Sequence, residues 1–423
     1  MLSFINKNML ISDSQFGFRK SLSTEDALLD FLTPVYTHMN TGKKVAALFI
    51  DITKAFDTVN HNILLNKLYD FGFRGNMHDF LKFYLKNRSQ KVKIRDTLSN
   101  NLPINVGVPQ GSVLGPVLFL LYIESIFHLN LIGRITAFAD DLALSYVGHS
   151  YLNLKQQISD DLKLLRKWFI MHDMVLSAKS KVMFFDTSGN IPIRGVKYHS
   201  LNCDNLSCNT FCLDIESVSV FKYLGVQVDN QLNWKTHLEK LKKSLILANI
   251  KIYRLRTYVS REILKMVYFS LVDSHIKYGI ASWGGTYKSS LRPIITLQKQ
   301  IIRVINFRNR RTHTHPLFVK DLILPVRNLY IYTVLKIFFI RSGYLNNKET
   351  ITYNLRYKSN CHYVKPRTEL FRKFFMYTAP YVYNKLPLDL KQQRNSKQFL
   401  NLLKPYLLNK SSDEIEELFD VCK

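Results

Sequence analysis

Apolar runs and amphipathic segments alternate along the first 186 residues of the chain. Lys44–Ile52 (KVAALFIDI) is almost continuously apolar and follows Gly42, which predicts a strand buried on both faces. Asn60–Tyr69, Met77–Leu85 and Leu152–Trp168 each repeat apolar residues at helical spacing, so we expect three amphipathic helices. This part of the chain therefore mixes strands and helices.

Two short β-like runs frame a pair of acidic residues. Arg134–Phe138 and Leu142–Tyr146 are separated by Ala139-Asp140-Asp141, which predicts a hairpin with a carboxylate pair at its tip. Further upstream, Gln90–Ile94 alternates polar and apolar residues, the pattern of a half-buried strand.

The second half of the chain changes its pattern twice. Gly189–Val220 is rich in Asn, Ser and Cys and weakly patterned, which predicts an insertion or two poorly defined strands. Phe221–Val228 is typical of a short strand, and Trp234–Arg310 is strongly helical and basic. From Thr312 onward, helical segments alternate with basic and Tyr/Phe-rich pieces, to which the pattern assigns no role.

Composition adds a large positive excess to this pattern. The chain carries 59 Lys+Arg against 32 Asp+Glu, a formal net charge of +27, which favours a nucleic-acid partner over a merely soluble basic surface. A hydrophobic content of 47% excludes a disordered chain, and only five cysteines exclude a disulfide scaffold. The longest apolar run, Val113–Ile123, is too short to span a membrane, and Met1–Leu10 does not have the pattern of a signal peptide. We expect an intracellular globular protein with no membrane association, and the choice between nucleus and cytoplasm stays open.

Three carboxylates stand out against this basic background. Asp51 ends an apolar run, and Asp140 and Asp141 lie between two others. Ionised carboxylates cost several kcal/mol to bury unless they are paired or bind a metal. Such a cluster suits two divalent cations roughly 3.5–4 Å apart, which stabilise the attacking and leaving oxygens of phosphoryl transfer. For Asp140-Asp141 alone, the alternative is an ordinary turn.

A Gly- and Pro-rich stretch separates the first acidic residue from the pair. Gly107–Pro116 (GVPQGSVLGP) supplies glycines that let a backbone approach a nucleotide closely, and Gln110 offers an amide with both donor and acceptor. An apolar helical run, Val117–Ile126, follows.

In this order the motifs resemble those of reverse transcriptases of non-LTR (long interspersed) retrotransposons, most closely the jockey-like elements. The similarity covers nearly the whole chain. Its segments are Gln15–Arg19 (QFGFR) with Ser23-Thr24 as the fingers motif, Phe49–Asn60 (FIDITKAFDTVN) as motif A, Gly107–Pro116 as motif B, Phe138–Asp141 (FADD) as motif C, Leu176–Phe185 (LSAKSKVMFF) as motif D, Phe221–Val226 (FKYLGV) as the primer grip, and Tyr278–Gly285 with Leu297–Ile305 as the helical segment after it.

The resemblance implies a right-hand polymerase fold of the α+β class. Residues 1–40 would form partial fingers, 41–230 a palm (reverse transcriptase domain) with an antiparallel sheet, 231–311 a helical thumb, and 312–423 a C-terminal helical extension of unknown role. The implied partners are an RNA template, a DNA primer and a dNTP, and the implied cofactors are two Mg²⁺ (or Mn²⁺) ions. It leaves the oligomeric state open.

The resemblance also assigns roles around the carboxylates. Asp51 and Asp140 match metal ligands, Asp141 the third carboxylate of the site, and the backbone carbonyl of Ile52 a further ligand. Phe56 matches a steric gate that favours dNTP over NTP by filling the place of a ribose 2′-OH. Its alternative is a core phenylalanine.

Other matched residues would bind the incoming nucleotide. Arg19 matches a residue that contacts the triphosphate, for which a guanidinium is well suited. Gln110 and Gly111 would line the dNTP pocket. Lys179 matches a lysine that donates a proton to the leaving pyrophosphate, with an ordinary surface lysine as the alternative.

The last matched residues would hold the primer and the duplex. Tyr223, Leu224 and Gly225 would position the primer 3′ end, although Tyr223 equally suits a strand aromatic packed in the core. The basic helices after Trp234 would grip the heteroduplex through its phosphates, with a solvated helical face as the alternative. Their candidate contacts are Lys240, Lys242, Lys243, Lys251, Arg254 and Arg256.

The chain departs from the family in what precedes the polymerase motifs. Family proteins carry an endonuclease domain and a further fingers segment ahead of the QFGFR-like motif, so the sequence predicts a 5′-truncated copy. Cys203, Cys208 and Cys212 cluster, but their spacing does not suit a zinc site.

Three functions compete at this stage. The first is an RNA-directed DNA polymerase with two-metal chemistry. The second is a catalytically inactive nucleic-acid-binding remnant of the same element. The third, a viral RNA-dependent RNA polymerase, is disfavoured by Phe56 at the gate position.

Overall fold

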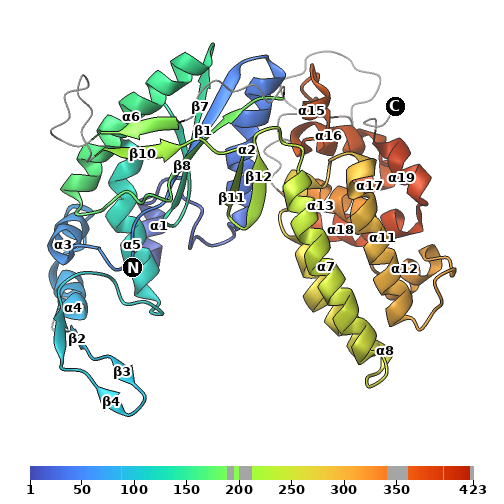
Figure 1. Cartoon of the computed structure of the whole chain (residues 1–423), viewed down its shortest axis with the longest axis horizontal. Helices are drawn as coiled ribbons and strands as arrows, with labels where there is room; N and C mark the ends of the chain where they lie inside the picture. The colour runs from blue at the N-terminus through green and yellow to red at the C-terminus, as the bar shows by residue number, and fades with distance from the viewer. Residues whose placement is uncertain (87, 188–194, 200–211, 341–360, 394, 420–423) are drawn as a thin grey trace. The chain divides into compact units, whose positions relative to one another are not determined.

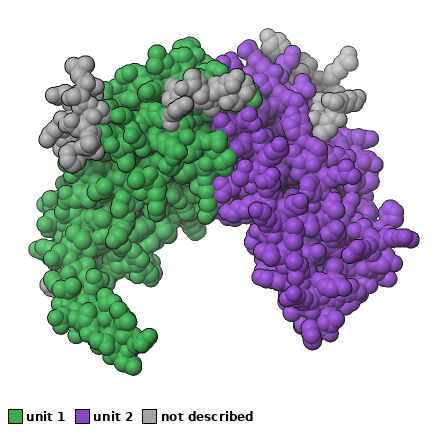
Figure 2. All heavy atoms as spheres, in the orientation of Figure 1, with its two compact units in different colours: residues 1–38, 43–224 green, residues 39–42, 225–423 purple. Residues whose placement is uncertain are grey.

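The computed structural model describes residues 1–86, 88–187, 195–199, 212–340, 361–393 and 395–419 (Figure 1). The chain divides into two compact units, which Figure 2 shows in separate colours. Unit 1 comprises residues 1–38 and 43–224, and unit 2 comprises residues 39–42 and 225–423. The three candidate carboxylates all belong to unit 1.

A four-stranded antiparallel sheet forms the centre of unit 1, in the order β6-β7-β1-β8. Its strands are β1 (Lys44–Ile50), β6 (Arg134–Phe138), β7 (Asp141–Gly148) and β8 (Lys181–Phe185). Six of the seven residues of β1 are buried, as its continuous apolar run predicts. The predicted hairpin is confirmed as well, because β6 and β7 pair on either side of a short turn that contains Asp140.

Helices pack on both faces of this sheet. One face shares a hydrophobic core with α5 (Leu114–Ile123) and α6 (Tyr151–Met171). On the other face, Phe49 of β1 packs against Phe31 of α2 (Thr24–Asn40), with 5.5 Å between the ring centroids. Cover on both faces explains why β1 is apolar throughout instead of alternating.

The three predicted amphipathic helices are confirmed as α3 (His61–Asp70), α4 (Gly75–Leu85) and α6. Side chains that accept backbone N–H groups fix two of their starts. Asn60 accepts from the second and third residues of α3, and Ser150 accepts from the third residue of α6. The other short elements of unit 1 are α1 (Leu2–Lys7), the 3₁₀ helix η1 (Glu124–His128), β9 (Gly195–Tyr198), β10 (Leu213–Glu216) and β11 (Val220–Tyr223).

The prediction of a half-buried strand at Gln90–Ile94 is wrong. The chain forms a protruding hairpin there, built from β2 (Arg88–Gln90), β3 (Lys93–Ile94), β4 (Thr97–Leu98) and β5 (Leu102–Ile104), with β2 paired to β5 and β3 to β4 (Figure 1). Val92 and Ile94 are 59% and 70% exposed. Alternation of polar and apolar residues predicted the strands, but it does not establish that one face of them is covered.

The single strand predicted at Phe221–Val228 is two strands, β11 and β12 (Val226–Asp229). Leu224 and Gly225 interrupt it with positive φ angles of 44° and 84°, which turn the chain. Within Gly189–Val220, the described residues include the antiparallel pair β9 and β10, in line with the prediction of two strands.

Unit 2 is helical in the part that the structure describes, apart from β12. Its helices are α7 (Lys235–Leu255), α8 (Arg261–Tyr268), the π-helix η2 (Phe269–Asp273), α9 (Ser274–Lys277), α10 (Ile280–Trp283), α11 (Lys288–Ile305), α12 (His315–Asp321), α13 (Val326–Ile340), α15 (Glu369–Arg372), α16 (Phe375–Lys385), α17 (Leu388–Lys391), α18 (Ser396–Asn409) and α19 (Ser412–Leu418). α7 packs on α11, and α13 packs on α16 and α18.

Buried polar contacts join the helices before and after Thr312 within unit 2. Arg327 of α13 is 4% exposed and donates to the backbone carbonyls of Gly284 and Thr286 at 2.9 and 3.0 Å. It also pairs with Glu416 of α19 at 3.4 Å. The helices after Thr312 therefore share a core with those before it.

No single helix in the described residues is long and apolar enough to cross a membrane. α12 and α13 together meet the length and composition of a span, but the chain bends by 45° between them.

Candidate active site

Asp51, Asp140 and Asp141 lie at the same end of neighbouring strands in the central sheet. β1 and β7 remain in register up to Ile50 and Leu142, so the adjacent residues Asp51 and Asp141 stand at the same end of the two strands. Asp140 lies in the turn between β6 and β7. The strand register therefore gathers the three carboxylates that the sequence pattern singled out.

The electrostatics of the three carboxylates show that they interact. Burial raises the pKa of Asp140, and the charge of Asp51 raises it further, against a backbone hydrogen bond that lowers it. Asp141 is exposed to solvent, but the protein around its carboxylate still desolvates it, and together with the charges of Asp140 and Asp51 this raises its pKa to about 6, with Lys222 opposing them. Mutual repulsion of this kind is relieved when a cation binds.

The donor set fits an open site for a hard divalent cation. Carboxylate oxygens are the ligands that Mg²⁺ prefers, and this ion commonly takes its remaining ligands from water and substrate phosphates. Within the described residues, no group of three or more His, Cys, Asp or Glu side chains is arranged so that it could hold a metal ion by itself.

The backbone of Ile52, the other predicted ligand, lies beside motif D. Ile52 forms an isolated antiparallel bridge with Leu176. The hydrogen bonds of this bridge come from flanking residues, Thr53 N to Val175 O at 3.0 Å and Ser177 N to Asp51 O at 2.8 Å. The bridge therefore holds the strand end without using the Ile52 carbonyl.

Two serines that sequence reasoning missed anchor Asp51. Ser177 donates its backbone N–H to the Asp51 carbonyl, and the Asp51 N–H donates to Ser180 Oγ at 3.1 Å. Ser180 is 1% exposed. Lys179 lies between them with an exposed side chain, and its backbone N–H donates to Ser177 Oγ at 3.2 Å. Hydroxyl residues beside a lysine carry no distinct sequence signal, which is why the resemblance pointed to Lys179 alone.

Replacing Ser180 with Ala is expected to lower the free energy of unfolding by about 1–3 kcal/mol, because the Asp51 N–H loses its acceptor. Chemical denaturation measures this change. Ser159→Ala on α6 is the matched control, since its exposed hydroxyl donates only to a backbone carbonyl within the helix. Equal stability of the two variants would show that Ser180 does not hold the strand end.

Phe56, five residues after Asp51, is half-buried. Its ring stacks on Phe119 of α5 with 4.2 Å between centroids and meets the edge of the Phe18 ring at 6.3 Å. Contact on two sides fixes the ring, while part of it remains accessible. The packing is compatible with both readings of this residue, a gate and a core aromatic.

Motif B lies against the loop after Asp51. Gln110 Nε2 donates to Asp57 Oδ1 at 2.7 Å. Gly107 has a φ of 86°, and a Cβ there would lie 2.9 Å from the Asp57 carbonyl oxygen, so only glycine allows this approach. Gly111 has a φ of 78° and is exposed. The structure therefore brings Gln110 close to motif A, as a shared nucleotide pocket requires.

Arg19 is folded onto its own loop. Its Nη1 donates to the carbonyls of Ser12 and Gln15 at 2.8 and 3.1 Å, and its Nη2 pairs with Asp13 at 3.2 Å. In this arrangement the guanidinium organises the loop, and contact with a triphosphate requires that some of these bonds be exchanged.

The predicted primer-grip residues occupy different environments. Tyr223 is 2% exposed and packs against Phe31 and Phe49 at 5.2 and 5.5 Å, which favours the core reading of its ring. Leu224 and Gly225 form the turn that follows, and a Cβ on Gly225 would lie 2.9 Å from the ring of Tyr278.

The basic candidates lie in unit 2, on α7 and at its C-terminus. Lys240, Lys242, Lys243, Lys251 and Arg254 are exposed. Arg256 is half-buried, with its guanidinium 5.1 Å from the centre of the Phe307 ring. Five of the six therefore present their charge to solvent.

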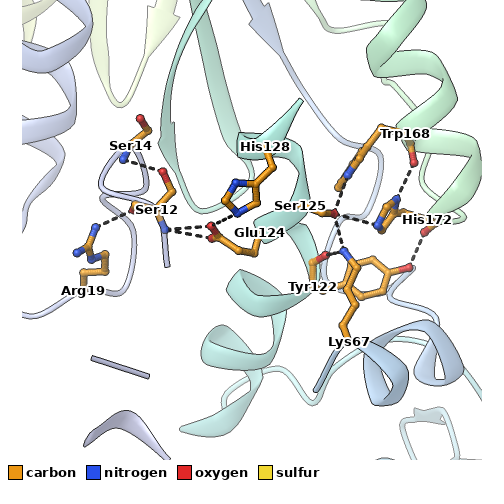
Figure 3. A network of polar contacts seen from close by, with 10 residues as sticks. All are labelled: Ser12, Ser14, Arg19, Lys67, Tyr122, Glu124, Ser125, His128, Trp168 and His172. Carbon is orange, nitrogen blue, oxygen red and sulfur yellow. Dashed lines mark hydrogen bonds and ion pairs between the residues drawn. The ribbon is translucent and has the colours of Figure 1, made fainter. Parts of the chain in front are cut away.

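A polar network that the sequence did not indicate joins the N-terminal segment, α3, η1 and α6 within unit 1 (Figure 3). Glu124 is 3% exposed, and both of its carboxylate oxygens accept the Ser12 N–H at 3.2 Å. Desolvation raises the pKa of Glu124 to about 7, although Ser12, Arg19 and Lys67 each lower it. Glu124 thereby ties the N-terminal segment to η1.

Ser125 connects the remaining residues of this network, Lys67, Trp168 and His172 (Figure 3). Its hydroxyl accepts from Lys67 Nζ at 2.7 Å and from Trp168 Nε1 at 2.9 Å. Both partners are pure donors, so the single hydroxyl proton goes to His172 Nε2, 3.2 Å away. His172 then carries its proton on Nδ1, which donates to the Trp168 carbonyl at 2.8 Å. The tautomer of this buried histidine is fixed by its neighbours.

The cysteine cluster lies largely outside the described residues, which include Cys212 but not Cys203 or Cys208. Cys212 Sγ lies 3.8 Å from His199 Nδ1.

Comparison with known proteins finds a matching family and several relatives. The family of reverse transcriptases (RNA-dependent DNA polymerases) matches residues 1–228, just over half of the chain. The chain is 26% identical over 348 residues to a probable RNA-directed DNA polymerase from transposon BS of Drosophila melanogaster, which covers 78% of this chain and 35% of that protein. It is 26% identical over 307 residues to the RNA-directed DNA polymerase from mobile element jockey of the same species, covering 69% and 32%.

The chain spans about a third of the length of these relatives. Among solved structures, telomerase from Candida albicans aligns over 95% of this chain and 57% of that chain, with 11% identity and a TM-score of 0.40. That structural likeness is too weak to support an assignment, which depends instead on the sequence match. The chain belongs to the reverse transcriptase (RNA-dependent DNA polymerase) family.

Proposed function

We propose that the chain is an RNA-directed DNA polymerase of a non-LTR retrotransposon, which adds dNTPs to a primer 3′-OH along an RNA template. The observation that carries this proposal is the position of Asp51, Asp140 and Asp141 at the same end of neighbouring strands in a chain of the reverse transcriptase family. The names of its relatives, RNA-directed DNA polymerases from mobile elements, support the same reaction.

The three aspartates and the Ile52 carbonyl would hold two Mg²⁺ (or Mn²⁺) ions. When bound, such ions stabilise the charge on the attacking 3′ oxygen and on the leaving pyrophosphate. Desolvation, with added repulsion between the carboxylates, raises the pKa values of Asp140 and Asp141, and bound cations would offset both effects.

The other residues of the site bind and orient the substrates. The Gln110 amide, held by Asp57, forms one wall of the nucleotide pocket, with the exposed backbone of Gly111 beside it. The packed ring of Phe56 occupies the space of a ribose 2′-OH. Arg19 contacts the triphosphate after releasing part of its own loop, and the exposed Lys179 delivers a proton to pyrophosphate.

In the right-hand description, residues 1–40 belong to the fingers, 41–230 to the palm, 231–311 to the thumb and 312–423 to a C-terminal extension. The antiparallel sheet of unit 1 supports a palm, and the exposed basic residues of α7 support phosphate contacts with a template–primer duplex. Leu224 and Gly225 remain the primer-grip candidates, since the Tyr223 ring is buried.

A primer-extension assay on poly(rA)/oligo(dT) with Mg²⁺ or Mn²⁺ tests the proposal. We expect dTTP incorporation that depends on the metal and is lost in Asp51→Asn. Salt-sensitive duplex binding without any extension above the Asp51→Asn background would show an inactive nucleic-acid-binding remnant instead. Preferential use of UTP would indicate an RNA polymerase.

Replacing Phe56 with Leu is expected to raise the use of rNTP relative to dNTP by about tenfold, because a smaller side chain leaves room for a 2′-OH. The ratio of kcat/KM for UTP and dTTP measures this change. Phe119→Leu is the matched control, since that ring packs beneath Phe56 and is fully buried. An unchanged ratio in Phe56→Leu would assign Phe56 to packing alone.

A further inference from the structure

Gln15 lies beneath the turn that carries Asp140, although 124 residues separate it from that turn. Its backbone forms an isolated parallel bridge with Ala137 of β6. Phe16 N donates to the Ala137 carbonyl, and Ala137 N donates to the Ser14 carbonyl, both at 2.8 Å. Residues 14–16 thus extend the edge of the central sheet next to the hairpin.

The Gln15 side chain grips the peptide groups of Ala139. Its Oε1 accepts the Ala139 N–H at 2.8 Å, and its Nε2 donates to the Ala139 carbonyl at 3.2 Å. Oε1 also accepts the Gly17 N–H at 2.8 Å. Because two backbone N–H groups point at the same end of the amide, that end must be the oxygen, and the orientation of the side chain is determined. Gln15 is 1% exposed, so water does not compete for these bonds.

Ala139 needs this support because of its backbone. Its φ is 55°, in the left-handed region that costs a residue with a Cβ roughly 1 kcal/mol or more. It immediately precedes Asp140, so its conformation sets the direction in which the Asp140 backbone leaves the turn. Two hydrogen bonds from one buried amide hold Ala139 in this unfavourable conformation.

Gly17 makes the contact possible. A Cβ at this position would lie 2.3 Å from Ala139 N and 3.0 Å from Ala139 Cα. Any larger residue would therefore push the loop away from the turn. Arg19 closes the same loop by donating to the Gln15 carbonyl at 3.1 Å.

We propose that Gln15 is a positioning residue for Asp140, acting through the Ala139 peptide groups, and that residues 14–17 belong to the scaffold of the carboxylate site. This inference rests on the proposed function for its catalytic consequence. Groups that orient a metal ligand without touching the metal typically contribute 10–100-fold to metal affinity or activity. Gln15 would orient Asp140 in this way, through the Ala139 peptide groups and without touching the metal.

Gln15→Met tests the proposal, because it keeps the size of the side chain and removes all three hydrogen bonds. Gln156→Met on α6 is the matched control, since the exposed Gln156 amide donates only to Asp160. We expect Gln15→Met to weaken Mn²⁺ binding, followed by electron paramagnetic resonance of the free ion, by about tenfold or more. We also expect kcat for primer extension to fall by a similar factor while KM for the template–primer stays constant.

Residue-level hydrogen exchange locates the change in the chain. The Ala139 and Gly17 amides should lose protection in Gln15→Met, whereas the Ala137 amide, bonded to the Ser14 carbonyl, should keep it. A merely structural role would lower the fraction of active molecules in a single-turnover burst and leave both the Mn²⁺ affinity and the rate per active molecule unchanged. That result would overturn the proposal.

Gly17→Ala provides a second test if Gln15→Met folds poorly. It keeps the Gln15 side chain but pushes the loop and the turn apart by a steric clash, because the added Cβ would lie 2.3 Å from Ala139 N and 3.1 Å from Gln15 Oε1, and the same losses are expected. If the wild-type chain extends no primer, the proposed function fails, and Mn²⁺ binding by the variants still decides the positioning role. Wild-type Mn²⁺ affinity in both variants would contradict it.

Discussion

Asp140→Asn is expected to reduce primer extension by more than about a hundredfold, with little change in template–primer affinity. Loss of a residue that only orients a metal ligand already costs 10–100-fold, so loss of the ligand's own charge should cost more. The neutral amide keeps the shape of Asp140 but removes the charge that interacts with Asp51 and Asp141. Single-turnover extension and fluorescence anisotropy measure the two effects separately.

Asp160→Asn is the matched control for this prediction. Asp160 is also an aspartate of unit 1, but it lies on α6 and pairs with Lys163 at the surface. Surface pairs of this kind contribute about 0–1 kcal/mol, so activity should stay near the wild-type value. Comparable activity in Asp140→Asn and Asp160→Asn would remove the carboxylate cluster from the reaction.

The central sheet was predictable because its signals are local. A continuous apolar run predicted β1 as a strand buried on both faces, and an acidic pair between two short β-like runs predicted the β6-β7 hairpin. The prediction that Gln90–Ile94 is half-buried was wrong because its signal is local too. Alternation of polar and apolar residues does not say whether another segment covers one face of the strand. Burial depends on contacts between distant segments, which a local pattern does not contain.

The candidate site was predictable as a set of residue types and not as a set of contacts. The three carboxylates followed from the motifs, and the register of β1 and β7 gathers them. The anchoring of Asp51 by Ser180 and the grip of Gln15 on Ala139 join segments 129 and 124 residues apart. Serine and glutamine have many possible partners, so nothing in the sequence selected these.

The network around Glu124 and His172 makes the stability of unit 1 respond to pH. Burial and the charge of Lys67 lower the pKa of His172 to about 4, from an ordinary value of 6.5. Between these values the unfolded chain binds a proton that the folded chain does not, so the stabilising effect of neutral His172 is complete above pH 6.5 and is lost as the pH falls. Glu124 has the opposite sign. Desolvation raises its pKa from 4.5 to about 7, so its effect is complete below pH 4.5 and is lost as the pH rises through 7.

The effects of His172 and Glu124 on the free energy of unfolding therefore oppose each other between about pH 4.5 and 6.5. Glu124→Gln removes the effect of Glu124, so the effect of His172 should then be measurable by itself. For each group, the difference in pKa between the folded and unfolded chain corresponds to about 3 kcal/mol, and both side chains are buried, so solvent screens little of this effect. Relative to the wild type, the free energy of unfolding of Glu124→Gln is expected to rise by about 3 kcal/mol from pH 4.5 to pH 7.

Hydrogen exchange of the buried β1 amides under native conditions measures this difference within unit 1 alone, without assuming that both units unfold together. His172→Gln should show the reverse trend against the wild type, falling by a similar amount as the pH rises from 4 to 6.5. Glu216→Gln, at an exposed carboxylate that pairs with Lys181, should run parallel to the wild type. Parallel curves for Glu124→Gln would mean that Glu124 is ionised at neutral pH, and that the Ser12 N–H, Arg19 and Lys67 together offset the desolvation of its carboxylate.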